Sequence, residues 1–211
     1  MIDVRWFGHS MWRISHQGVT IVTDPFTDIG YPMPTGLAAD IVLVSHDHYD
    51  HHNTALVHGD PTVVREAGQY EFCGVAIDMA PCWHDEEQGA QRGPNLLMRF
   101  DVGGRRFVHC GDLGHMPDDE TLARLGEVDV LMVPVGGFYT IDAGTAGKLV
   151  EKLKPKIVFP MHYKTAVLDF PIDTVEPFAR HASNVRVVEN NHVILAPADF
   201  EQTQTILLGF K

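Results

Sequence analysis

Hydrophobic residues in this chain fall into short runs of strand length that turn residues separate. Near the N-terminus, residues 2–7, 11–15 and 19–23 have this form, and the turn His16-Gln17-Gly18 precedes the third run. Short apolar runs bounded by glycine, proline, asparagine or aspartate are typical of β-strands. The chain is therefore predicted to begin with three strands.

The run Ile41-Val42-Leu43-Val44 is apolar at every position. A continuous apolar run suits a strand that is buried on both faces and covered by helices. The turn Gly103-Gly104 predicts a hairpin between two later runs. The further strands predicted from such runs are 62–65, 75–79, 95–101, 105–110, 128–134, 157–159, 185–188 and 205–208.

Helical spacing of apolar residues is clearest after Asp142, a candidate N-cap, and continues to Leu153 before Pro155 ends the predicted helix. Shorter helices are expected at 53–57, 117–125 and 174–181. Strands followed by a helix occur twice along the chain, so each half is expected to supply one sheet. No linker-like composition interrupts the sequence, and residues 1–211 are expected to form a single domain.

Charge and cysteine content narrow the class of partner. The formal net charge is -12, and an acidic surface repels phosphate backbones, so no nucleic-acid partner is expected. A small-molecule substrate is favoured instead. The positive field of a metal site could attract a small anion to such an acidic protein. The three cysteines, Cys73, Cys82 and Cys110, are odd in number and are expected to be buried, reduced thiols.

The first residues lack the apolar core of a signal peptide, and no apolar stretch is long enough for a membrane span. A cytoplasmic location is therefore expected. The sequence does not decide whether the protein forms a homo-oligomer.

Thirteen histidines are many for this length, and three of them lie in the segment His46-Asp47-His48-Tyr49-Asp50-His51. This segment directly follows the apolar run 41–44. Residues two apart on an extended segment point the same way, so His46 and His48 can bind one ion together. Asp50 and His51 follow where the chain must turn and can face a second ion.

Three further candidate ligands lie just beyond later predicted strands. His84, Asp112 and His162 each follow an apolar run by a few residues. Open α/β sheets place their sites at the carboxyl ends of strands. We therefore expect these side chains to meet the histidine segment at one shared edge.

These residues resemble the motifs of the metallo-β-lactamase superfamily, whose pattern is His-x-His-x-Asp-His. The resemblance extends to Gly8-His9-Ser10, Gly111-Asp112-Leu113-Gly114 and Pro160-Met161-His162-Tyr163. It points to the branch similar to ascorbate-6-phosphate lactonase and N-acyl-phosphatidylethanolamine phospholipase D. Leu113 is a departure, because related proteins commonly have threonine there.

The resemblance implies an α/β fold, an αββα sandwich of two mixed β-sheets with helices outside. It implies a dinuclear site for two divalent metal ions, Zn or Mn, with Fe left open. One ion would be held by His46, His48 and His84 and the other by Asp50, His51 and His162, while Asp112 would bridge them.

Such a site implies a hydrolase that uses a metal-bridging hydroxide on a small ester, lactone or phosphodiester. Asp50, Asp112 and His115 are the candidate catalytic residues. Tyr139 and Tyr163 are further proton-donor candidates. Outside the reacting groups, Lys164 could bind an anionic substrate, His9 could line the pocket, and Asp24 or Asp47 could orient ligand imidazoles.

Two other classes of function stay open. An iron-dependent oxidoreductase of the persulfide dioxygenase type would use the same fold and ligands, and metal analysis separates it from a hydrolase. A non-catalytic binder is disfavoured, because buried histidines and carboxylates are costly without an ion.

Overall fold

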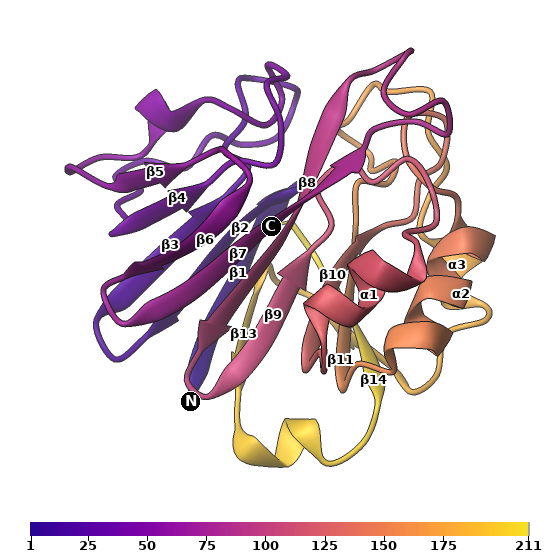
Figure 1. Ribbon diagram of the computed structural model, residues 1–211. Coiled ribbons are helices and arrows are strands. Elements are labelled where there is room, and N and C mark those ends of the chain that lie inside the picture. The colour runs from indigo at the N-terminus through magenta and orange to yellow at the C-terminus, as the bar shows by residue number, and fades with distance from the viewer. Residues whose placement is uncertain (211) are drawn as a thin grey trace.

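The computed structural model describes residues 1–210 and contains two mixed β-sheets packed face to face (Figure 1). The first sheet has the strand order β13-β1-β2-β3-β4-β5. Its strands are β1 Ile2–Gly8, β2 Met11–His16, β3 Val19–Thr23, β4 Ile41–Leu43, β5 Thr62–Val64 and β13 His192–Leu195.

The second sheet has the strand order β12-β14-β11-β10-β9-β8-β7-β6. Strands β9, β10 and β11 are parallel, whereas β6 to β9 form antiparallel pairs. Its strands are β6 Gly68–Phe72, β7 Val75–Trp83, β8 Pro94–Val102, β9 Arg105–His109, β10 Val130–Pro134, β11 Ile157–Met161, β12 Val185–Val188 and β14 Gln204–Leu208.

The main hydrophobic core lies between the sheets. Large side chains from both sheets interlock there, and the rings of Trp12 and Phe159 lie 5.1 Å apart. Outside the second sheet lie α1 Asp119–Leu125, α2 Ala143–Leu153 and α3 Glu176–Ala179 (Figure 1). The expected layered architecture of two mixed sheets is confirmed.

The outer face of the first sheet has a different cover from the expected helices. Val22 and Val42 point to this side and pack against loop residues, among them Phe26 and Leu168. The helix expected at 53–57 is only the 3₁₀ turn η1 Thr54–Leu56. Asn53 forms no side-chain cap because its Nδ2 donates to the carbonyl of Phe26 at 3.1 Å.

Three differences from the sequence expectation concern the C-terminal part and the sheet edges. The helix expected at 174–181 is reduced to α3. Strands β6 and β13 were not expected, and a 3₁₀ turn, η2 Pro197–Phe200, follows β13. The two halves also exchange strands, since β6 and β7 join the second sheet and β13 pairs with β1 in the first.

The ends of several strands meet at one edge of the sandwich. The parallel strands β3 and β4 of the first sheet and β9, β10 and β11 of the second end there. The β1–β2 turn reaches the same edge, because the amide of His162 bonds to the carbonyl of His9 at 3.3 Å. Gly8 has φ +106°, and a Cβ there would lie 2.2 Å from the Tyr31 ring, so only glycine allows this turn.

Within residues 1–210, no helix has the length and apolar content needed to cross a bilayer. Cys82 and Cys110 are buried as expected, but Cys73 is exposed in the β6–β7 turn. Burial raises the pKa of Cys82 to about 12, so this thiol stays protonated at neutral pH.

Candidate metal centre

The loop after β4 is held by a single carboxylate. Asp24 accepts the backbone N–H of Ser45 at 2.8 Å and the Ser45 hydroxyl at 2.7 Å. The Ser45 Oγ lies 2.9 Å from His46 Nδ1, and Asp24 Oδ2 lies 3.0 Å from His51 Nδ1. Because these partners take up Nδ1, the Nε2 atoms of both imidazoles are left facing the site.

Asp24 was therefore a correct candidate for an orienting group, and it acts on two of the candidate ligands. Asp47 orients none of them. Its exposed carboxylate lies 2.6 Å from Nδ1 of His52.

A first group of imidazoles, here called the open cluster, consists of His46, His48 and His84. One ring nitrogen from each lies within 4.8 Å of the others. His46 and His84 are buried, whereas His48 is partly exposed. His84 reaches the cluster from the end of β7, so the open cluster joins the two sheets.

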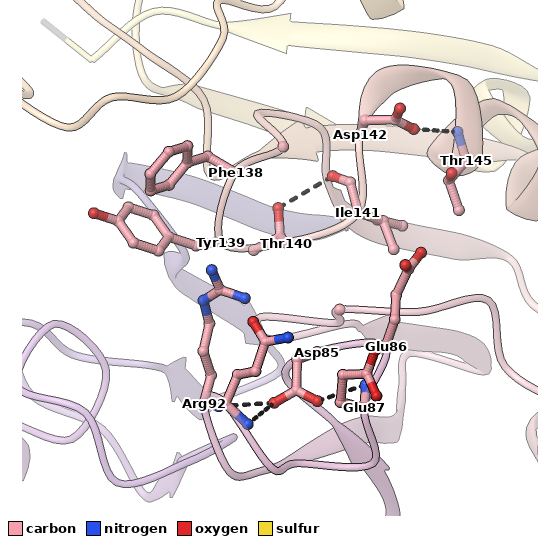
Figure 2. Close-up of a pocket in the computed structure, with 13 residues that line it drawn as sticks. Asp85, Glu86, Glu87, Arg92, Phe138, Tyr139, Thr140, Ile141, Asp142 and Thr145 are labelled. Carbon is pink, nitrogen blue, oxygen red and sulfur yellow. Dashed lines mark hydrogen bonds between the residues drawn. The ribbon is translucent and has the colours of Figure 1, made fainter.

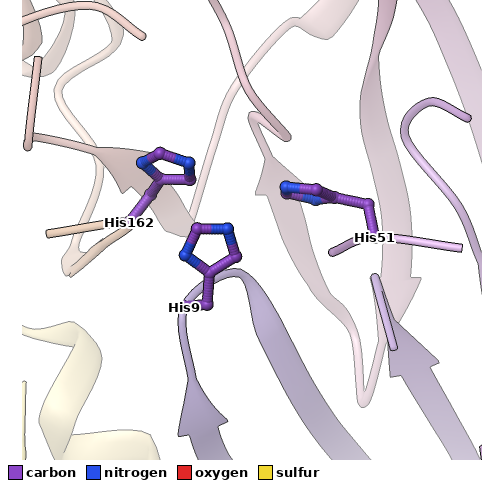
Figure 3. Close-up of side chains that lie close together, drawn as sticks. All are labelled: His9, His51 and His162. Carbon is purple, nitrogen blue, oxygen red and sulfur yellow. The ribbon is translucent and has the colours of Figure 1, made fainter. Parts of the chain in front are cut away.

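A second group, here called the buried cluster, consists of His9, His51 and His162 (Figure 3). These side chains come from the β1–β2 turn, the loop after β4 and the end of β11, and all are at most 1% exposed. Figure 3 shows the three rings converging. Both His9 and His162 have a positive φ of 50°, a strained backbone that is common at functional sites.

Asp112 lies between the two clusters. Its Oδ2 is 3.2 Å from His84 Nε2 and 3.1 Å from His162 Nε2. Its Oδ1 is 3.2 Å from His51 Nε2. Asp112 itself is fixed by its backbone N–H, which donates to Asn95 Oδ1 at 3.0 Å. One carboxylate is thus in reach of both clusters.

Several of these buried atoms have no hydrogen-bond partner among residues 1–210. They include His51 Nε2 and Asp112 Oδ1, which face each other without hydrogen-bond geometry. A buried polar atom left unpaired costs about 1–3 kcal/mol. The unpaired Nε2 of His51 and Oδ1 of Asp112, with the ring nitrogens grouped in the two clusters, form a donor set that fits a cation.

Burial keeps the imidazoles of His46 and His9 in the neutral form. It lowers the pKa of His46 to about 2, and the nearby His51 adds to the effect. Burial and the nearby His162 lower the pKa of His9 to about 4. These rings are therefore neutral at pH 7 without a metal present.

Asp50 lies beside the buried cluster and lines the adjoining cavity. Its Oδ2 is 3.2 Å from His9 Nε2 and 3.8 Å from His51 Nε2. Burial alone would raise the pKa of Asp50, but the hydrogen bond from His9 and the charge of His51 hold it below its usual range. From the sequence, His9 is expected only to line the pocket. In the structure it is fully buried and does not line the cavity, and it contacts Asp50 directly.

A cavity of about 320 Å³ opens onto the two clusters. The residues that line it are His48, Tyr49, Asp50, His84, Arg92, Asp112, Tyr139, His162 and Phe170. Arg92 was not predicted to be a site residue, because nothing in its local sequence distinguishes it from other surface arginines.

Three residues expected near the reaction do not line this cavity. Both ring nitrogens of His115 are occupied, Nε2 by the Trp83 N–H at 3.2 Å and Nδ1 at 3.0 Å from the Met116 carbonyl. Tyr163 is buried with its ring against Trp6. Lys164 Nζ donates to the carbonyl of Phe170 at 2.8 Å.

Leu113, the departure from the family pattern, has a fully buried side chain. Its carbonyl accepts the Ile141 N–H at 2.8 Å. The residue after Asp112 therefore supports the loop through its backbone and through apolar packing.

This chain is similar to known proteins both in sequence and in structure. A sequence model described as "Beta-lactamase superfamily domain" matches residues 3–162. A metal-dependent hydrolase of Carboxydothermus hydrogenoformans is 30% identical over 196 residues, covering 78% of this chain and 85% of the relative. Another, from Thermococcus onnurineus, is 32% identical over 194 residues, covering 78% and 86%.

A crystal structure from Thermotoga maritima, described as a Zn-dependent hydrolase of the metallo-β-lactamase superfamily, has a TM-score of 0.86 and 34% identity, covering 99% of both chains. The diiron β-hydroxylase CmlA of Streptomyces venezuelae has a TM-score of 0.61 at 16% identity, covering 98% of this chain and 53% of CmlA. The second similarity shows a shared fold alone.

Proposed function

The chain belongs to the metallo-β-lactamase superfamily, and from this membership we propose that it is a dinuclear metal-dependent hydrolase of small esters, lactones or phosphodiesters. The observation that carries the proposal is Asp112, whose carboxylate lies within 3.2 Å of an imidazole of each cluster. Both sheets contribute to this arrangement, which supports treating residues 1–211 as one functional domain.

The open cluster would hold one ion through His46, His48 and His84. The second ion would be held by His51 and His162 of the buried cluster with the carboxylate of Asp50. Asp112 would bridge the two ions. The unpaired Nε2 of His51 and Oδ1 of Asp112 support this assignment, because an ion would satisfy both atoms.

His9 is a positioning residue in this proposal. Its Nε2 lies 3.2 Å from Asp50 Oδ2, and its low pKa makes it a neutral donor to that carboxylate. The bond fixes Asp50 beside the buried cluster.

When bound, two divalent ions such as Zn or Mn supply a water-derived nucleophile at neutral pH and stabilise negative charge on the reacting oxygen. The chain provides the remaining functions. The burial of the imidazoles limits competing water, and Asp50 stays ionised at neutral pH, as a metal ligand must be. Tyr139 is the one candidate donor among the predicted tyrosines that lines the cavity.

The proposal is tested by metal analysis of the protein as isolated, followed by a screen of esters, lactones and phosphodiesters. Hydrolysis should disappear after chelation and return when Zn or Mn is restored. Undiminished hydrolysis by metal-free protein would contradict the proposal. Iron content with oxygen uptake and no hydrolysis would favour the oxidoreductase alternative.

A further inference from the structure

The loop between β7 and β8 is fixed by a buried carboxylate. Asp85 accepts four backbone N–H groups of this loop, at 2.8 Å from Glu87, 2.9 Å from Gly89, 3.0 Å from Gln91 and 2.7 Å from Arg92. On its other side, a Cβ at Gly114 would lie 2.2 Å from the Asp85 nitrogen, so the two loops are in close contact. The backbone of Arg92 is therefore held in place.

In the part of the chain that the structure describes, the side chain of Arg92 has no acidic partner. Its guanidinium lies 5.7 Å from the ring centroid of Tyr139 (Figure 2), which favours a cation–π contact. Within residues 1–210, it forms no ion pair with a carboxylate, and its only hydrogen bond is made by its backbone N–H. The side-chain donors of the guanidinium are thus available to a ligand.

Arg92 and Tyr139 stand between two cavities. On one side is the cavity of about 320 Å³ that contains His48, His84 and Asp112. On the other is a cavity of about 280 Å³ whose lining includes Glu86, Glu87 and Asp142 (Figure 2). The carboxylates of the second cavity repel an anion. In the first cavity, Arg92 is the only lysine or arginine of the described lining, and the charges of the two carboxylates there, Asp50 and Asp112, would be offset by bound metal ions.

We propose that Arg92 binds a negatively charged group of the substrate, a carboxylate or a phosphate, while the bond to be cleaved lies over Asp112. This inference rests on the proposed hydrolase function and narrows its substrates to small esters, lactones or phosphodiesters that carry a second, anionic group. A guanidinium suits this role because its planar fork binds either oxyanion through two hydrogen bonds.

The rest of the cavity is consistent with such a substrate. Tyr139 and Phe170 form apolar walls, and the exposed ring of Tyr49 lies at the same cavity. A volume of about 320 Å³ is at the low end for ligand pockets. The substrate therefore combines a small apolar body with one anionic end.

The test compares matched esters with the metal-loaded protein: para-nitrophenyl butyrate, mono-para-nitrophenyl succinate and the corresponding ester with a terminal phosphonate. The wild type should have a lower KM for the two anionic esters, and their relative KM values distinguish carboxylate from phosphate. R92Q should raise the KM for the preferred anionic ester roughly tenfold or more, the loss expected from a charge-assisted hydrogen bond. The KM for the butyrate ester should stay nearly unchanged.

Two variants serve as controls. R92K keeps the charge without the fork and should restore only part of the lost affinity. R65Q removes an exposed arginine that lines none of the described cavities and should match the wild type. Equal KM changes for neutral and anionic esters in R92Q, or no wild-type preference for an anionic ester, would overturn the inference.

A binding measurement keeps the inference testable without turnover. Succinate and inorganic phosphate are titrated calorimetrically into metal-loaded wild type and R92Q, and R92Q should bind at least one of them roughly tenfold more weakly. Equal binding of both anions to both proteins would overturn the inference. Failure of the proposed hydrolase function looks different, because the wild type would then hydrolyse no ester, lactone or phosphodiester at all.

Discussion

The open cluster and the buried cluster both consist of histidines, but they differ in solvent exposure. In the open cluster, His48 is partly exposed and lines the cavity. In the buried cluster, His9, His51 and His162 are almost completely removed from solvent. Asp112 lies between the two, within contact distance of both.

The difference assigns the clusters different tasks within the proposed function. An ion in the open cluster would face the cavity and exchange with solvent. An ion in the buried cluster would reach the same cavity only on the side of Asp50 and His162. Its imidazoles are almost fully buried, and that of His51 is held by Asp24. We therefore expect the two positions to differ in exchange rate and in their dependence on supporting residues.

The largest expected effect is loss of the group that joins the clusters. D112A should lower metal content at both positions and reduce kcat/KM by about three orders of magnitude or more, because charge stabilisation of several kcal/mol is lost. Mass-spectrometric metal analysis and ester hydrolysis measure the two effects. D47A removes an exposed carboxylate of the same segment and should behave as wild type. If D112A kept both ions and normal turnover, Asp112 would not be the residue that joins the two clusters.

Chelation kinetics should distinguish the clusters directly. Metal release from the wild type into excess chelator should be biphasic, with a fast phase from the open cluster and a slow phase from the buried cluster. H48A should remove the fast phase and H162A the slow one, as followed with a coloured chelator. A single phase in the wild type that neither variant alters would show that the clusters do not differ in exchange.

A smaller difference between the clusters is expected when the residues that hold their imidazoles, Asp24 and Ser45, are changed. D24N disturbs the acceptor of His51 Nδ1, whereas S45A removes the group beside His46 Nδ1. Loss of such supporting bonds typically costs 10–100-fold in metal affinity. D24N should weaken both positions, since Asp24 also holds Ser45, whereas S45A should weaken mainly the open cluster. Calorimetric metal titrations measure this, and equal effects of S45A on both affinities would contradict it.

The smallest effect concerns the pH dependence of the metal-free protein. Burial alone would lower the pKa of His51, but the carboxylates of Asp112 and Asp24 raise it well above 6.5. A raised pKa in the folded state stabilises the protein below the unfolded pKa, and this contribution is lost as the pH rises through the folded pKa. The Tm of metal-free protein should therefore fall as the pH rises above about 6.5, the ordinary pKa of histidine.

The control for this effect is H52Q, which removes a partly exposed histidine beside Asp47. H52Q should keep the fall in Tm, whereas H51Q should show a flatter dependence because the titrating group is absent. An unchanged pH profile in H51Q would assign the effect to another group.

Strands with strong apolar patterns were predicted well from the sequence. The runs at 2–7, 19–23 and 41–44 correspond to β1, β3 and β4 with small shifts at their ends. Strand β6 was missed because its residues alternate between partly buried and exposed. Strand β13 was missed because it directly follows the turn at Asn190-Asn191. Both are edge strands, where pairing and not apolar content defines the strand.

The candidate ligands were also selected from the sequence, because histidine and aspartate bind metals, each follows an apolar run, and together they resemble the motifs of the superfamily. The structure places His46, His84, Asp112 and His162 close together, and their role as metal ligands stays a prediction. It does not bring His115 into the cavity, since backbone groups occupy both of its ring nitrogens.

The sequence by itself thus determined the fold class, through its resemblance to the metallo-β-lactamase superfamily, and the set of candidate ligands. Both follow from motifs that are local properties of the chain. Only the tertiary structure decided that His9 supports Asp50, that Asp24 orients two imidazoles, and that Arg92 faces the cavity. These roles depend on contacts between loops that are distant in sequence. The roles of these side chains depend on how deeply each is buried and on whether another residue occupies its polar atoms. No local sequence pattern contains that information.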